Sequence, residues 1–305
     1  MDTRTALNLA GKHLQSLEGH VFNILTVTKP VSPNAAVNLA KVISKLSPLL
    51  GNLIEFNTVE ILNDKSDFKG HGTWRRQDPG FPDTIFQGSI KPVPGFEIKA
   101  WFPLATEITA RFKDSQNHFT KDNTHVAMLA WLPEKLIYGK PEILAVCVMS
   151  GKSVAAARDN HYHNPPDYIV LEPGDTTART SNLQQTNTNG YKFQGTAKEF
   201  ERARKLVASW GKNGGKYRPT PRYEAKVREL FSKFSYRLDT NFAKMDRIVH
   251  VEIEKFKNEV MSAVVHGLKV QEWRSLLANE DEEAIRAALQ SRLGITAQDS
   301  KALVQ

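Results

Sequence analysis

Two apolar runs of strand length constrain the fold more than any other feature of this sequence. They are THVAMLAWLP at 124–133 and PEILAVCVMS at 141–150, with Pro or Gly at their ends. Runs of this length are typical of strands buried on both faces of a sheet. A helix is expected at 151–161, before a further short apolar run at 167–173. This order predicts a βαβ element in an α/β fold with a mixed central sheet flanked by helices.

The chain before residue 62 is expected to be helical. Apolar residues recur with helical spacing after Ser32 and Pro33, which form an N-cap and first-turn pair, and Gly51 is expected to interrupt the segment. The polar, glycine-rich stretch at 65–83 predicts a loop that leads into a strand. A hairpin follows, with strands at 84–90 and 96–102 joined by the turn KPVPG.

The hairpin carries residue types that suit phosphodiester chemistry. Asp83 precedes the first strand, and Glu97 and Lys99 lie two residues apart on the second, so their side chains share one face. Carboxylates are suitable ligands for a hard divalent cation, and the backbone carbonyl of Ile98 is a natural further ligand. A lysine beside such an ion and a phosphate can orient the attacking water or stabilise developing negative charge.

These residues resemble a known motif. Pro82-Asp83, a gap of 13 residues and Glu97-Ile98-Lys99 resemble the PD-(D/E)xK motif of a nuclease superfamily, and the resemblance covers roughly residues 45–173. It implies a restriction-endonuclease-like core with Mg²⁺ as cofactor and in-line attack by a metal-activated water. Asp83, Glu97 and the Ile98 carbonyl then hold the metal, and Lys99 assists the water.

In this superfamily an acid on the preceding helix often assists the metal site. Glu55 and Glu60 both occupy that place in the sequence. The spacing of Glu55 from Gly51 resembles the family pattern more closely, so Glu55 is the expected accessory acid. Helical periodicity places the two acids on different faces, and only one of them is expected to reach the site.

Charge and cysteine content restrict the class of partner and the compartment. The chain holds 41 Lys and Arg against 33 Asp and Glu, a formal charge of +8, which favours a polyanion such as nucleic acid. The single cysteine, Cys147, excludes a disulfide framework within the chain and a Cys-based zinc site. This low cysteine content fits a protein of the reducing bacterial cytoplasm. No apolar run has the length of a membrane span, so no membrane partner is expected.

Two groups of residues are expected to contact DNA. The polar tract at about 174–195 is the expected recognition segment, because Asn and Gln pair with adenine and Arg with guanine in the major groove. Its candidate side chains are Arg179, Asn182, Gln184, Gln185, Asn187 and Asn189. Phosphate contacts are expected from basic residues around the hairpin and in a glycine-rich connection. These residues are Arg75, Arg76, Arg111, Lys113, Lys212, Lys216, Arg218 and Arg222.

Taken with its size, the resemblance implies a type II restriction endonuclease that cuts double-stranded DNA. Residues 1–210 would form the nuclease core with the recognition segment, and 211–305 a helical subdomain for dimerisation or for embracing the DNA. The resemblance further implies a homodimer and a DNA methyltransferase acting on the same site. Three alternatives stay open: a structure-specific repair or recombination nuclease, a non-catalytic DNA-binding protein on the same scaffold, and a basic helical interaction module.

Overall fold

The computed structural model describes most of the chain, and the chain divides into two compact units. The described residues are 1–77, 80–104, 119, 121–163, 169–170, 190–216, 218, 220–239, 248–279 and 281–296. The first unit comprises 1–108, 119–154 and 251–305, and the second comprises 109–118 and 155–250. This division differs from the expected one at residue 210, because the last three helices belong to the first unit.

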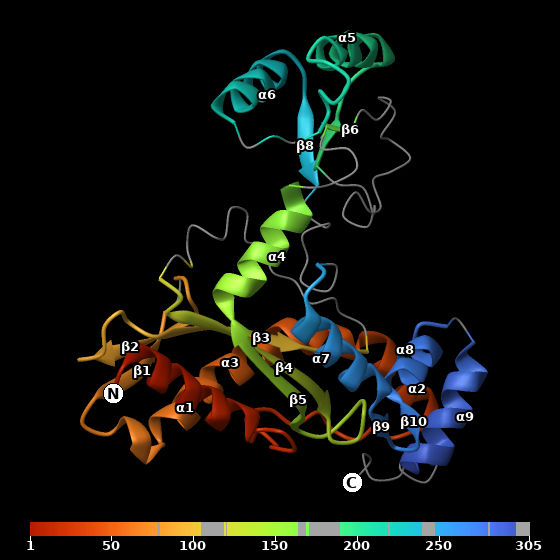
Figure 1. Ribbon diagram of the computed structural model, residues 1–305. Coiled ribbons are helices and arrows are strands. Elements are labelled where there is room, and N and C mark those ends of the chain that lie inside the picture. Colours follow the sequence, from red (N-terminus) through yellow and green to blue (C-terminus); the bar gives the residue numbers. More distant parts are fainter. Residues whose placement is uncertain are drawn as a thin grey trace. The chain divides into compact units, whose positions relative to one another are not determined.

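A mixed five-stranded sheet forms the centre of the first unit (Figure 1). The strand order is β1-β2-β3-β4-β5, with β3 and β4 parallel and all other neighbours antiparallel. The strands are β1 (Gly72–Arg76), β2 (Thr84–Gly88), β3 (Gly95–Trp101), β4 (Thr124–Pro133) and β5 (Pro141–Ser150). The expected α/β class with a mixed central sheet is confirmed.

Helices from both ends of the chain pack around this sheet. Their bounds are α1 (Thr3–Gln15), α2 (Pro33–Val42), α3 (Ser47–Asn63), α7 (Val251–Ser262), α8 (Val270–Leu277) and α9 (Glu282–Leu293). Shorter elements are the 3₁₀ helices η1 (Ile43–Leu46) and η2 (Ser66–Phe68) and the small hairpin of β9 (Val264–Val265) and β10 (Leu268–Lys269). The predicted start of α2 is confirmed, because Ser32 accepts a hydrogen bond from the Ala35 N–H with Pro33 in the first turn.

Successive residues of β3 face opposite helical layers. Ala100 faces α3, where a Cβ placed on Gly51 would lie 3.6 Å from the Ala100 Cβ. Trp101 faces α7, and its ring centroid lies 5.9 Å from that of Phe256. Since side chains alternate along a strand, Glu97 shares the Trp101 face and its neighbour Ile98 is wholly buried on the other.

Several sequence expectations are met and others are wrong. The expected hairpin is present as antiparallel β2 and β3. The expected βαβ element is not: β5 pairs antiparallel with β4 at the edge of the described sheet, and the next strand, β6 (Ile169–Val170), joins another sheet. Strand β1 lies where the sequence predicts a loop. This edge strand buries a single side chain, Trp74, so no apolar alternation marks it in the sequence. Gly51 lies inside α3 and does not interrupt it.

The second unit has its own small sheet and core. Strand β6 pairs parallel with β7 (Gly190–Phe193), which pairs antiparallel with β8 (Tyr236–Asp239). Two helices, α5 (Ala197–Ala208) and α6 (Pro221–Lys233), supply most of the buried apolar side chains. The core comprises Phe193, Ala203, Val207, Tyr223, Val227 and Leu230. Strand β8 falls where the sequence predicts helix. The boundary between the units falls within α4 (Gly151–His163).

A search of the described residues finds no helix with the length and apolar character needed to cross a membrane.

The position of Gly51 generates a stability prediction. A methyl group there meets only the Ala100 Cβ, at an ordinary contact distance of 3.6 Å. Gly51→Ala should therefore raise the free energy of unfolding by about 0.5–1 kcal/mol, because alanine loses less backbone entropy in a helix. Urea unfolding measures this change.

Gly11→Ala in α1 is the matched control. Its new Cβ would lie 3.3 Å from Val148 Cγ1, which is tighter than ordinary contact. We expect a smaller gain or none there. A loss of stability in Gly51→Ala would contradict the packing of α3 on β3.

Candidate active site

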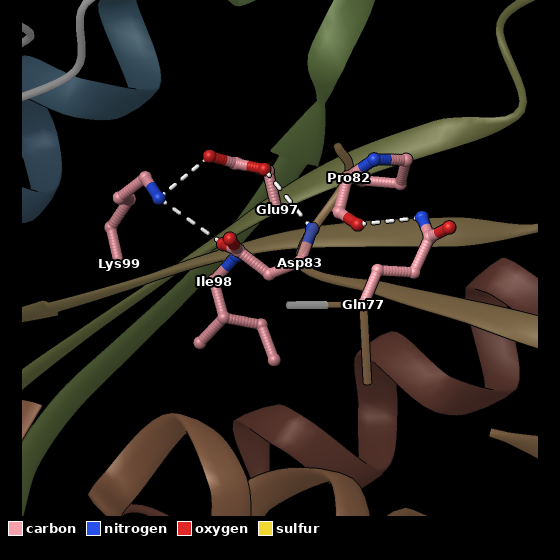
Figure 2. Close-up of polar contacts among 6 residues, drawn as sticks. All are labelled: Gln77, Pro82, Asp83, Glu97, Ile98 and Lys99. Atoms are coloured by element: carbon pink, nitrogen blue, oxygen red, sulfur yellow. Dashed lines mark hydrogen bonds and ion pairs between the residues drawn. The ribbon is translucent and has the colours of Figure 1, made fainter. Parts of the chain in front are cut away.

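The register between β2 and β3 places Asp83 beside Glu97. Thr84 pairs with Phe96 and Ile85 with Gly95, so continuing the register by one residue sets Asp83 opposite Glu97. Two hydrogen bonds fix this approach (Figure 2). The Asp83 N–H donates to Glu97 Oε2 at 3.2 Å, and the Ile98 N–H donates to Asp83 Oδ2 at 2.8 Å. The two carboxylates therefore converge from neighbouring strands.

The ammonium group of Lys99 lies between these carboxylates. Its Nζ is 2.6 Å from Glu97 Oε1 and 3.1 Å from Asp83 Oδ2 (Figure 2). The Glu97 side chain is 5% exposed, whereas those of Lys99 and Asp83 are 22% and 25% exposed. The cluster is thus anchored on a buried glutamate and open to solvent at its other two members.

The backbone around Pro82 and Asp83 is held by a residue that the sequence did not single out. The Gln77 backbone N–H donates to the Asp83 carbonyl at 2.7 Å. Its side-chain Nε2 donates to the Pro82 carbonyl at 2.9 Å (Figure 2). A Cβ on Gly95 would lie 2.6 Å from Pro82 Cγ, so only glycine permits this close approach. No sequence pattern marks Gln77, because its role depends on a pairing between strands.

On helix α3, Glu55 is half-buried and Glu60 is exposed. Burial, and then the negative charge of Asp83, raise the pKa of Glu55 from 4.5 to about 7, while Lys99 and Arg76 oppose the rise. The choice of Glu55 over Glu60 and its catalytic role stay predictions.

Burial shifts the pKa values of the buried charges at this site. Burial raises the pKa of Glu97 from 4.5 to about 7; Lys99 lowers it and Asp83 raises it further. Burial acts to lower the pKa of Lys99, but the carboxylates of Glu97 and Asp83 outweigh it and raise that pKa. Burial and the negative charge of Asp83 thus destabilise Glu55 and Glu97 as anions.

The donor set suits a hard divalent ion with few protein ligands. Among the described residues, no group of three or more His, Cys, Asp or Glu side chains is arranged to hold a metal. Mg²⁺ usually keeps several waters and takes only one or two carboxylates, which Asp83 and Glu97 provide. An added cation would also offset the buried negative charge. The Ile98 carbonyl stays a predicted further ligand.

The other expected DNA contacts divide into three groups. Arg75 is exposed on β1 and donates to Gln87 Oε1 at 3.1 Å, and Arg76 donates to the Asn52 carbonyl at 3.4 Å. Lys212 and Lys216 are exposed in the second unit, where Arg218 and Arg222 line a cavity. The remaining residues lie outside the described part of the chain: Arg111, Lys113, Arg179, Asn182, Gln184, Gln185, Asn187 and Asn189.

Comparison with protein-family models, with curated proteins and with solved structures found no match.

The raised pKa of Glu97 generates a pH-dependence prediction. Between about pH 4.5 and about pH 7 the folded protein retains a proton on Glu97 that the unfolded chain has lost. This group therefore makes the free energy of unfolding fall as the pH rises through that window. Glu97→Gln removes this contribution, so the variant should gain stability relative to the wild type as the pH rises.

Urea unfolding in EDTA at about pH 5 and about pH 8 measures the difference. Glu60→Gln, at an exposed position on α3, is the control and should shift stability equally at both pH values. An equal effect of Glu97→Gln at both pH values would contradict the burial of this carboxyl as the cause of its raised pKa.

Proposed function

We propose that this protein is a Mg²⁺-dependent endonuclease of the PD-(D/E)xK superfamily that hydrolyses phosphodiester bonds in double-stranded DNA. The observation that carries the proposal is the convergence of Asp83, Glu97 and Lys99 within hydrogen-bonding distance. Glu97 and Lys99 share a face on any strand, but a chance motif gives no reason for Asp83 to meet them. Here two strands, their register and the alternation along β3 act together to bring the three side chains to one point.

Each residue of the site has a role that its surroundings support. Asp83, Glu97 and the Ile98 carbonyl would hold the ion. When bound, Mg²⁺ supplies a Lewis acid for the phosphate and lowers the pKa of a bound water. Lys99 is a cation beside two carboxylates, so it would donate hydrogen bonds to the attacking water or to a phosphate oxygen and offset negative charge there.

Glu55 is the residue best suited to hold a proton. Its pKa of about 7 lies close to neutral pH, where proton transfer by a carboxyl group is most effective. During hydrolysis the attacking water loses a proton as its oxygen bonds to phosphorus, and the leaving oxygen gains one as its bond breaks. The Glu55 carboxylate would take up the proton of the water.

Within this superfamily we assign the protein to the type II restriction endonucleases. The chain length, the formal charge of +8 and a polar tract suited to base contacts support this assignment. The enzyme would act as a homodimer in the bacterial cytoplasm, without a membrane partner. A DNA methyltransferase acting on the same site would protect the host DNA.

Digestion of unmethylated phage DNA tests this function. The wild type should give discrete bands with Mg²⁺ and none with EDTA, and Lys99→Ala should abolish them. Lys45→Ala, at an exposed position of η1, is the matched control and should cleave normally.

Two other outcomes would favour the alternative functions. A Mg²⁺-dependent smear would overturn sequence specificity in favour of a less specific or structure-specific nuclease. Binding without cleavage of linear, branched or mismatched DNA would leave a non-catalytic DNA-binding protein.

The accessory acid is tested by a pair of substitutions on one helix. Glu55→Gln should lower the single-turnover cleavage rate by about 100-fold or more, as expected for loss of a proton-transfer group. Glu60→Gln removes an equal charge from α3 but faces solvent, so its rate should stay within about twofold of the wild type. Equal rates for the two variants would remove Glu55 from the mechanism.

A further inference from the structure

The second unit contains a cavity of about 250 Å³ between the loop after α5 and the start of α6. Its lining combines aromatic and basic side chains, among them Trp210, Arg218, Arg222 and Lys226. We propose that this cavity binds a nucleotide, with its base packed against Trp210 and its phosphate held by the basic residues. The proposal goes beyond the nuclease function and requires no cleavage.

The loop that forms one wall is a folded turn and not an extended linker. The Gly211 N–H donates to the Ala208 carbonyl at 3.1 Å, and the Gly214 N–H donates to the Gly211 carbonyl at 2.8 Å. Gly211 has a φ of +109°, which favours glycine. A Cβ on Gly214 would lie 2.9 Å from Trp210 Cβ, so the glycine lets the loop fold tightly against the tryptophan.

The charge of the lining selects an anion. Arg218, Arg222 and Lys226 all line the cavity, and none of the described lining residues is acidic. The acid in the first turn of α6, Glu224, lies 3.8 Å from Arg228 in an ion pair one helical turn away. Three cations without an acidic partner in the same lining create a positive potential, which arginine satisfies best with phosphate oxygens.

The aromatic residues select a flat ligand. Trp210 and Tyr223 meet edge to face, with ring centroids 6.0 Å apart and an interplanar angle of 82°. Lys226 Nζ lies 5.9 Å from the Trp210 ring centroid, within the range of a cation–π contact. These contacts hold the indole in place, and a base packed against a fixed aromatic ring typically contributes about 1–3 kcal/mol.

The size of the cavity narrows the choice to a single nucleotide. A volume of about 250 Å³ falls just below the range of about 300–1,000 Å³ that is typical of sites for drug-sized ligands. It therefore suits one base with its phosphate and not a dinucleotide cofactor. The same chemistry is offered by a free mononucleotide and by one nucleotide of a single strand.

Tryptophan fluorescence gives a direct test, because Trp210 differs from the other four tryptophans. Trp74, Trp101, Trp131 and Trp273 are at most 4% exposed, whereas Trp210 is only partly buried. The full-length protein is titrated in EDTA with deoxyadenosine monophosphate, with oligothymidylate of about 12 nucleotides and with a duplex of equal length. We expect the emission to be quenched, and Trp210→Phe to abolish the quenching.

Matched arginine variants of α6 test the phosphate contact. Arg222→Gln should weaken binding of the quenching ligand by about tenfold, as measured by fluorescence anisotropy or competition. Arg228→Gln removes an equal charge from an exposed position outside the cavity, and it should weaken binding by less than about twofold. Both residues are exposed, so neither substitution should affect folding.

The outcomes decide the proposal and its ligand. Quenching by the mononucleotide assigns the site to a free nucleotide, and quenching by the single strand alone assigns it to a nucleotide within a strand. No quenching by any ligand, quenching retained in Trp210→Phe, or equal effects of Arg222→Gln and Arg228→Gln would overturn it. Cleavage with Mg²⁺ is assayed separately: quenching without cleavage contradicts only the nuclease, and cleavage without quenching contradicts only this site.

Discussion

The ammonium group of Lys99 lies between two carboxylates that come from different strands, and the rest of the first unit serves to hold that contact. Buried charges are costly unless they are paired, so the pair of β2 and β3 must keep one register for the site to exist. Burial nonetheless raises the pKa values of Glu97 and Glu55, so both glutamates are destabilised as anions. Shifted pKa values of this kind are characteristic of functional sites.

The support for the site lies mainly on the opposite face of the sheet. Ile98 is wholly buried between the two functional residues of β3, and α3 packs beneath the same strand. The strand therefore cannot shift by one residue without moving Ile98 out of the core and both charges into it. Gln77 and Gly95 both contact Pro82, and they thereby fix the backbone next to Asp83 on the neighbouring strand. The local structure thus combines a rigid apolar base with a partly solvated polar surface.

The two units differ in the chemistry that they offer to a phosphate. The first unit presents carboxylates with a lysine, a set that suits a metal ion and a reacting phosphodiester. The second presents arginine, lysine and aromatic rings without an acid in the cavity lining, a set that suits binding alone. The basic glycine-rich segment after α5 has the composition of a flexible linker. The backbone hydrogen bonds of Gly211 and Gly214 instead fold it into one wall of that cavity.

The features that the sequence predicts correctly are those that depend on neighbouring residues. The N-cap at Ser32, the strand pair around the turn at 91–95 and the shared face of Glu97 and Lys99 all follow from local sequence patterns. Four other features became visible only in the folded chain: the pairing of β5 with β4, the edge strand β1, the position of Gln77 and the cavity at Trp210. These features depend on contacts between distant segments, and no local pattern encodes which strand edge or helix end a segment will meet.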